Sequence, residues 1–201
     1  MKIHRWNAIN RLALLGIAMV AAVAMARPAL ADTLAVSADL PVSSSVTLKS
    51  AGSPATTYDS KSISGFTLGV SFPFLLGLGY ENYSSSFSKS STNTKFDYDV
   101  TMYDIFVNLP IPVVNIALGA GTGTGSVSHV NFPGMSSPFK DGDLTQWFAS
   151  IGIPITPLVD VHVGYHSFSG KNKATTAAAA SGFSDITVDG SMYSVGVKIG
   201  F

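Results

Sequence analysis

The chain ends in a stretch of strict two-residue alternation, from Ser191 to Phe201, which reads S-M-Y-S-V-G-V-K-I-G-F. In an extended strand, one face would carry large apolar side chains, namely Tyr193, Val195, Val197, Ile199 and Phe201. The opposite face would carry small, polar or charged residues, namely Ser194, Gly196, Lys198 and Gly200. A strand that separates lipid from a polar lumen has these two faces. The stretch therefore predicts the closing strand of a transmembrane β-barrel.

Seven further segments alternate in the same way, so the predicted fold is all-β: an eight-stranded antiparallel up-and-down barrel. We expect its strands at residues 33–40, 62–72, 76–87, 96–109, 114–126, 144–153, 158–168 and 191–201. Val46 and Leu48 either extend the first strand past Pro41 or begin the first loop.

The predicted connections are of two kinds. Three short turns are built on proline, at Phe72-Pro73-Phe74, Leu109-Pro110-Ile111 and Ile153-Pro154-Ile155. Proline at a strand end costs no hydrogen bond of the ladder. The other connections are longer, polar loops at residues 49–61, 88–95, 127–143 and 169–185. Short turns at one end and long loops at the other are typical of outer-membrane barrels.

The N-terminus has the pattern of a targeting segment. Three basic residues come first, an apolar run follows from Leu12 to Met25, and residues 29–31 form a small-x-small cleavage site. The run is shorter than the roughly 20 residues that a membrane-spanning helix needs. We therefore expect a cleaved signal peptide at residues 1–31 and a barrel at 32–201. A retained N-terminal anchor is the alternative.

The composition after this segment limits the possible functions. It contains 8 lysines, no arginine and 12 acidic residues, and the whole chain has no cysteine. An acidic chain without arginine is a poor nucleic-acid binder, so we expect no such partner. A secreted chain without disulfides must be held by its hydrogen-bonded ladder and its packing. Hydrophobic residues make up 46% of the chain and charged residues only 12%, which indicates β-structure with an apolar exterior.

The inner faces of the predicted strands carry most of their ionisable groups. This lumen polar network consists of Asp39, Glu81, Asp104, Asp160, His162, His166 and Lys198. An eight-stranded barrel is just wide enough for side chains to fill its interior, and an unpaired buried charge is costly. We therefore expect a polar plug in which Lys198 binds one or more carboxylates. The alternative is a gated polar path or a proton-sensitive switch that uses His162 and His166.

One predicted strand has a wall of glycines on its inner face, at Gly119, Gly121, Gly123 and Gly125. No Lys-Ser/Thr pair follows them, so they do not form a phosphate-binding loop. We expect Met102, Phe106 or Phe148 to fill the space that they leave. The alternative is a narrow cavity that admits a hydrophobic ligand.

Four outward-facing aromatic residues are predicted at one height. Phe66, Tyr103, Trp147 and Tyr165 each lie six residues from a strand end at a short turn. With a typical strand rise and tilt, that places them about 15 Å above the short-turn rim. They therefore indicate an aromatic girdle at a membrane interface.

The N-terminal segment, the eight alternating strands and the C-terminal strand that ends in Phe201 resemble the small eight-stranded outer-membrane barrels: the OmpA transmembrane domain, OmpX and OmpW group. The resemblance covers nearly all of the chain after residue 31. It implies that the terminal strand, with Tyr193 and Phe201, is the signal read by the barrel assembly machinery. It also implies the outer membrane of a Gram-negative bacterium as the location and its lipid as a partner.

Three functions remain open at this level. The first is a monomeric, non-enzymatic barrel with a structural or surface-interaction role through its loops, without cofactor or metal and with an unknown extracellular partner. The second is a narrow conduit for a small, polar or hydrophobic solute. The third is a lipid-modifying enzyme. Lipid A deacylase barrels are implied to use a His-x-Ser pair, but here Gly164 follows His162 by two residues and Phe168 follows His166. Two histidines alone are also not a metal site.

Overall fold

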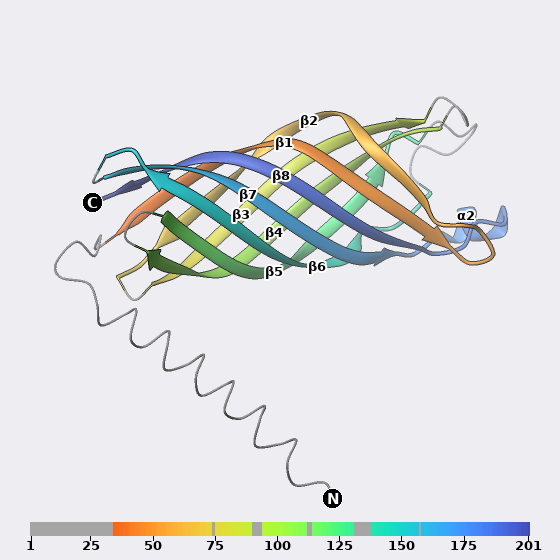
Figure 1. Cartoon of the computed structure of the whole chain (residues 1–201). Coiled ribbons are helices and arrows are strands. Elements are labelled where there is room, and N and C mark those ends of the chain that lie inside the picture. The colour runs from red at the N-terminus through yellow and green to blue at the C-terminus, as the bar shows by residue number, and fades with distance from the viewer. Residues whose placement is uncertain (1–33, 74, 90–93, 112–113, 131–137, 157) are drawn as a thin grey trace, which may run out of the picture.

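The computed structural model describes residues 34–73, 75–89, 94–111, 114–130, 138–156 and 158–201. Its strands are β1 (Ala35–Ser50), β2 (Thr56–Ser71), β3 (Leu76–Lys89), β4 (Thr94–Ile111), β5 (Val114–Ser128), β6 (Gly142–Pro154), β7 (Val159–Asn172) and β8 (Ile186–Gly200). Each strand pairs antiparallel with the next, and β8 pairs with β1 to close the barrel (Figure 1). This confirms the predicted fold. The expected signal peptide lies outside the described residues.

The strands extend further toward the long-loop end than the sequence predicted. The loop predicted at residues 49–61 is shorter in the structure, because β1 runs to Ser50 and β2 starts at Thr56. β8 likewise starts at Ile186 rather than at Ser191. The loop expected at 169–185 contains the short helix α2 (Thr176–Ala180), whose N-cap side chain accepts a hydrogen bond from the Ala178 N–H. Among the described residues, no helix is both long and apolar enough to cross a membrane.

A bulge in β1 reverses which residues face the lumen. Against β8, Pro41 pairs with Ser194 but Ser43 pairs with Tyr193, so Val42 is an extra residue in β1. Beyond this bulge Val46 extends the strand on its inner side, with 1% of its surface exposed. A bulge inserts one residue and so breaks the two-residue period that sequence reasoning relies on. The period of two therefore does not tell from the sequence whether Val46 belongs to the first strand or to the first loop.

The outer surface near the short turns is an apolar band. It carries most of the exposed large hydrophobic side chains, among them Val36, Leu68, Leu78, Ile105, Leu118, Ile151, Val163 and Val197. Along β8 and the residue after it, the band spans the nine residues from Tyr193 to Phe201. At the usual strand rise and tilt this corresponds to about 20 Å, close to the apolar belt of a membrane barrel.

Two arcs of aromatic rings border this band. In one arc, Tyr80 lies 6.1 Å from Phe66 and 5.3 Å from Tyr103, measured between ring centroids. In the other, the rings of Trp147, Tyr165 and Tyr193 follow one another at 5.5 and 5.1 Å. The four predicted girdle residues therefore occur in these arcs, and two further tyrosines, Tyr80 and Tyr193, join them. Rings at this height suit the lipid–water interface.

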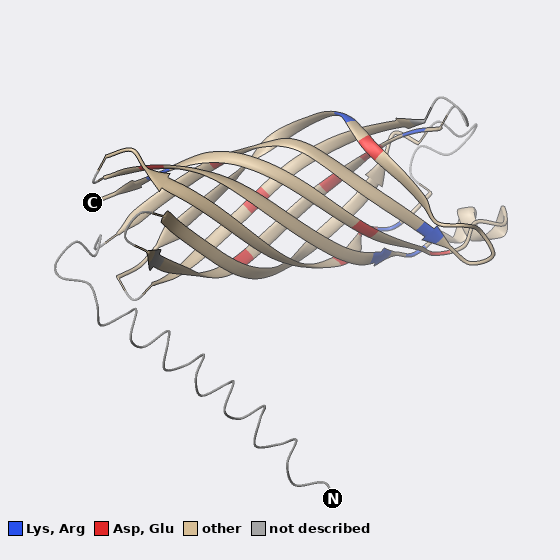
Figure 2. Cartoon of the chain, in the orientation of Figure 1, with Lys and Arg blue, Asp and Glu red and all other residues tan. Residues whose placement is uncertain are grey.

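Above the aromatic arcs the outer face is polar. Hydroxyl and amide groups on neighbouring strands bond to each other there, as in Thr47–Thr57 at 2.8 Å and Asn82–Thr101 at 3.0 Å. Figure 2 shows most of the blue strand segments toward the long-loop end. In the sequence, Lys49, Lys61, Lys95 and Lys171 lie in the strand parts nearest the long loops. This part of the barrel therefore has a water-compatible surface and projects beyond the apolar band.

The apolar band predicts where a charge is tolerated. Val197→Asp places a carboxylate midway between Tyr193 and Phe201, on the lipid-facing side of β8. We expect it to lower the free energy of unfolding by about 2 kcal/mol, because a charge on the lipid face is costly at this depth. Urea unfolding in lipid vesicles, followed by heat-modifiable mobility on gels, measures the loss.

Thr187→Asp is the matched control, since it lies on the same face of the same strand above the aromatic arcs. Its neighbours across the ladder are Lys49 and Lys171, which favour an added carboxylate. An equal drop in the free energy of unfolding for Val197→Asp and Thr187→Asp would contradict the conclusion that the apolar band faces lipid.

Candidate functional site: the barrel lumen

The lumen is divided into two halves of opposite character. The half near the long loops holds a packed cluster that we call the apolar plug: Val46, Tyr83, Phe87, Phe96, Tyr98, Val100, Met102, Val127, Leu144, Phe168, Ile186, Val188 and Met192. Its members have at most a few per cent of their surface exposed. The prediction of a polar lumen is therefore wrong for this half.

Aromatic stacking gives the plug its density. The rings of Phe87 and Phe96 stack with centroids 5.1 Å apart, and Tyr98 stacks on Phe168 at 6.2 Å. One signal in the sequence pointed to this packing. Along β4 the residues Phe96, Tyr98, Val100 and Met102 alternate in the same parity as the inward Asp104, so they face the lumen as well.

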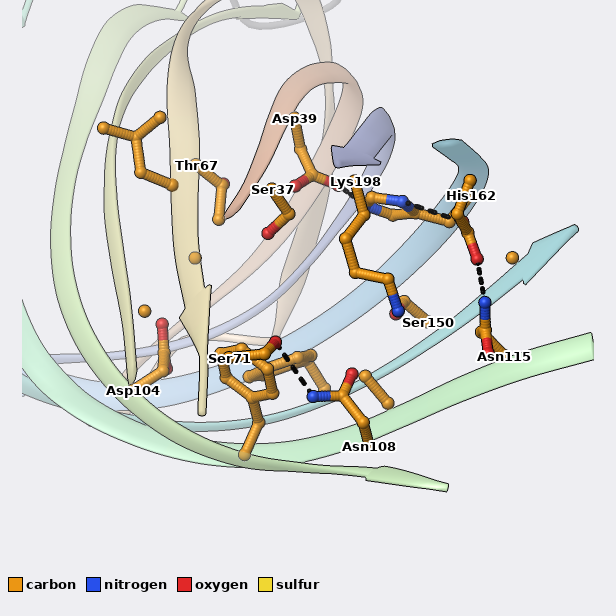
Figure 3. A pocket seen from close by; sticks show the side chains of 18 of the residues that line it. Ser37, Asp39, Thr67, Ser71, Asp104, Asn108, Asn115, Ser150, His162 and Lys198 are labelled. Atoms are coloured by element: carbon orange, nitrogen blue, oxygen red, sulfur yellow. Dashed lines mark hydrogen bonds and ion pairs between the residues drawn. The ribbon is translucent and has the colours of Figure 1, made fainter. Parts of the chain in front are cut away.

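The half near the short turns is polar and contains a cavity of about 60 Å³, which we call the acidic chamber. Its lining includes Asp39, Glu81, Asp104, Asp160, His166 and Lys198. Figure 3 shows side chains from several strands pointing into it, with Asp39, His162 and Lys198 together on one side and Asp104 on the other. The structure thus brings all members of the predicted lumen polar network to one end of the barrel.

The two histidines pair with the carboxylates of the chamber. His162 Nε2 lies 2.7 Å from Asp39 Oδ1, and its Nδ1 lies 3.5 Å from Asp160 Oδ1. His166 Nδ1 lies 2.8 Å from Glu81 Oε1. Ser194 connects the two groups, because its hydroxyl lies 3.5 Å from both Asp39 Oδ1 and His166 Nε2. Histidines therefore hold the position that the sequence prediction gave to lysine.

Lys198 corrects that prediction. Within the part of the chain that the structure describes, it forms no ion pair with a carboxylate. Its side chain instead extends into the chamber toward Ser150 (Figure 3). The register explains the difference: Lys198 lies opposite Asp160, whose carboxylate turns away to accept a hydrogen bond from the Asn115 amide.

Glycines determine which polar groups can meet. Asp39 on β1 reaches His162 on β7 across Gly196, the residue of β8 that lies opposite both. Asp104 on β4 reaches Gln146 on β6 across Gly121 in the same way, at 2.6 Å.

A third carboxylate, Asp160, crosses Gly152 to Asn115. At each of these glycines, Gly121, Gly152 and Gly196, a Cβ atom would overlap the carboxylate. We call such positions glycine saddles, since a side chain from one strand lies across the bare backbone of the next.

The predicted glycine wall is a row of such saddles. Phe148 covers Gly119 and Met102 covers Gly123, as expected, whereas Asp104 covers Gly121 and Tyr98 covers Gly125. Phe106 lies instead over Gly77. The wall is thus filled by side chains, and the alternative of a ligand cavity along it is wrong.

One serine of the lumen lies beside a histidine and a carboxylate. Ser194, His166 and Glu81 lie in the order of a nucleophile, a base and an orienting acid. Ser194 is only 1% exposed, however, and it does not line the chamber. Within the described ranges, no three His, Cys, Asp or Glu side chains are placed to hold a metal ion. The histidine–carboxylate contacts of the network join β7 to β1 and to β3 across the lumen.

The long-loop end carries an ordered polar contact of its own. Asp185 accepts a hydrogen bond from the Ala174 N–H at 3.0 Å, and its other oxygen lies 3.2 Å from Lys171 Nζ. These two contacts, the backbone hydrogen bond first, hold the pKa of the Asp185 carboxyl below its usual value. They fasten the segment that contains α2 to the end of β7.

No protein-family model matches the chain, and no curated protein matches it either. Solved structures do. Neisserial surface protein A (NspA) is similar with a TM-score of 0.59 at 17% identity, over 84% of this chain and 97% of that one. OprG from Pseudomonas aeruginosa (TM-score 0.48, 12% identity, 84% and 95% coverage) and Ail from Yersinia pestis (0.46, 16%, 82% and 98%) also match. The chain has the fold of the small eight-stranded outer-membrane barrels.

The glycine saddles predict a sharp difference between two alanine substitutions next to the same carboxylate. Gly121→Ala puts a Cβ into Asp104 Oδ1 and near the Tyr103 carbonyl, whereas Gly79→Ala meets its nearest atom, Asp104 Cβ, at 3.1 Å. We expect Gly121→Ala to cost about 2 kcal/mol of folding free energy through overpacking. Gly79→Ala should be nearly neutral, because reduced freedom of the unfolded chain offsets the tight contact. Urea titration measures the free energy of unfolding of both variants. Equal values for Gly121→Ala and Gly79→Ala would contradict the saddle geometry.

The Asp185 contact predicts the behaviour of its loop. The pKa of Asp185 is lowered in the folded chain. The stabilisation that its carboxylate gives the folded loop is therefore complete above the ordinary pKa of 3.8, and it is lost as the pH falls below that value. Asp185→Asn removes the negative charge of this side chain, as protonation at low pH does, and so weakens its contact with Lys171. We therefore expect the loop to open more often and trypsin to cut after Lys173 several-fold faster at pH 8. Asp59→Asn, on the outer face of β2, is the control. Unchanged cleavage in Asp185→Asn would show that the contact does not order the loop.

Proposed function

We propose that the chain is a monomeric, non-enzymatic outer-membrane barrel that does not conduct and that acts at the cell surface. The observation that carries this proposal is the apolar plug. Its aromatic rings fill the lumen at the height where a pore would have to pass, and its members are buried. Opening this path would expose packed apolar side chains to water, which is unfavourable.

The part of the barrel above the aromatic arcs supports a surface role. There the strands are polar outside and apolar inside, the arrangement of a water-soluble barrel. Its hydrogen-bonded ladders continue to the long-loop end, where α2 and the Asp185 contact order one connection. A rigid platform of this kind holds loops at a fixed distance from the lipid, and a surface contact needs such a platform.

Export and assembly complete the proposal. Residues 1–31 act as a cleaved signal peptide, and the terminal strand with Tyr193 and Phe201 is read by the barrel assembly machinery. The terminal strand closes the sheet, since the Phe201 N–H donates to the Leu34 carbonyl at 2.8 Å.

Single-channel recording tests the proposal. The refolded chain, inserted in a planar bilayer, should show no defined openings. The variant Phe96→Ala/Tyr98→Ala/Phe168→Ala removes aromatic rings from the plug and should open a pathway, which controls for insertion and orientation. Defined openings of the unmodified chain that change with Lys198→Glu would instead support the conduit.

A further inference from the structure

The acidic chamber has more negative than positive groups. Four carboxylates line it or bond within it (Asp39, Glu81, Asp104 and Asp160), against one lysine and two histidines. Even if both histidines are protonated, the carboxylates remain in excess. Charges buried without compensation are costly, so the excess carboxylates must be neutralised by a proton or by a bound cation.

The excess is concentrated at one point. His162 serves Asp39 and Asp160, and His166 serves one oxygen of Glu81. Several buried polar atoms of the described residues have no hydrogen-bond partner, and four of them lie in this part of the lumen: Glu81 Oε2, Asp104 Oδ2, Gln146 Oε1 and Thr67 Oγ1. Glu81 is 0% exposed, Asp104 4% and Gln146 6%, so bulk water does not satisfy these atoms.

The register brings these oxygens together from four strands. Thr67 on β2 lies opposite Glu81 on β3. Asp104 on β4 lies opposite Gly79, two residues before Glu81 on the same face of β3, and both carboxylates line the chamber. Gln146 reaches Asp104 across the Gly121 saddle and donates its amide hydrogen to Oδ1. Its amide oxygen therefore remains available. Three of the four residues, Thr67, Glu81 and Asp104, also line the chamber.

The ligand class follows from the donor atoms. Carboxylate, amide and hydroxyl oxygens are the ligands of hard cations, which complete their shell with water. The cavity of about 60 Å³ exceeds the space of a single water molecule, so an ion with bound water fits. The four atoms are all oxygens, which suits a hard cation better than a transition metal that prefers nitrogen or sulfur ligands.

We propose that Thr67, Glu81, Asp104 and Gln146 form a binding site for a hard cation of the Na⁺, Mg²⁺ or Ca²⁺ class. The ion neutralises the Glu81–Asp104 pair and ties β3 and β4 to β6 inside the barrel. The site does not depend on the surface role proposed above. It predicts that cations stabilise the fold specifically, beyond the effect of ionic strength.

Thermal unfolding of the refolded full chain in detergent tests the site. Unfolding is followed after removal of metal ions, with NaCl, MgCl₂ or CaCl₂ titrated against choline chloride at equal ionic strength. We expect at least one of the three salts to raise the midpoint in a saturable way. Glu81→Gln and Asp104→Asn should weaken the apparent affinity at least tenfold, whereas Asp59→Asn on the outer face should leave it unchanged.

Thr67→Val is the milder variant, in case loss of a carboxylate prevents folding. It keeps the shape and removes one ligand oxygen, so we expect a several-fold weaker apparent affinity. The proposal is overturned if none of the three salts exceeds choline chloride, because Glu81 and Asp104 then share a proton instead of a cation. It is also overturned if the effect is the same in Glu81→Gln, Asp104→Asn and Thr67→Val as in the unmodified chain.

Discussion

The circumference of eight strands is the constraint on which this structure depends. Such a barrel is too narrow for every inner position to carry a side chain of ordinary size. The chain meets this limit by placing glycine beside large inner side chains, so that Phe106 lies over Gly77 and Phe168 over Gly190. The same arrangement lets Asp104 pass across Gly121 to Gln146 on the strand beyond it. The interior is therefore a set of interlocking side chains on bare backbone.

The second organising feature is that the apolar face of the sheet changes sides at the aromatic arcs: it faces the lumen above them and the lipid below them. β4 shows this most clearly. Its inner residues change from Phe96, Tyr98, Val100 and Met102 to Asp104, while its outer residues change from Asp97, Asp99 and Thr101 to Tyr103, Ile105 and Val107. The alternation continues unbroken, and only the chemistry of the two faces is swapped. One sheet thus serves as a membrane barrel below the arcs and as a water-soluble barrel above them.

Sequence reasoning reached the membrane half of the molecule and largely missed the upper half. In the membrane half the strands keep an uninterrupted period of two, so the fold, the outward residues and the inward ionisable groups could be predicted. In the upper half, the bulge at Val42 changes the parity of β1, and serine-rich strand ends resemble loops. The partners of the charged lumen residues could not be predicted from the sequence for another reason. Asp39 meets His162 across a third strand, and no pattern local to any one strand encodes that contact.

The two halves of the lumen constrain each other. The plug ends in Met102 and Met192, both 0% exposed, directly beyond the polar groups of the chamber. At its opposite side, toward the short turns, the chamber is lined by Asn108, Asn115 and Lys198. In an outer-membrane orientation with the long loops outside, that end faces the periplasm. On the function proposed above, the chamber faces the periplasmic solution, the part above the plug faces the exterior, and the plug separates the two.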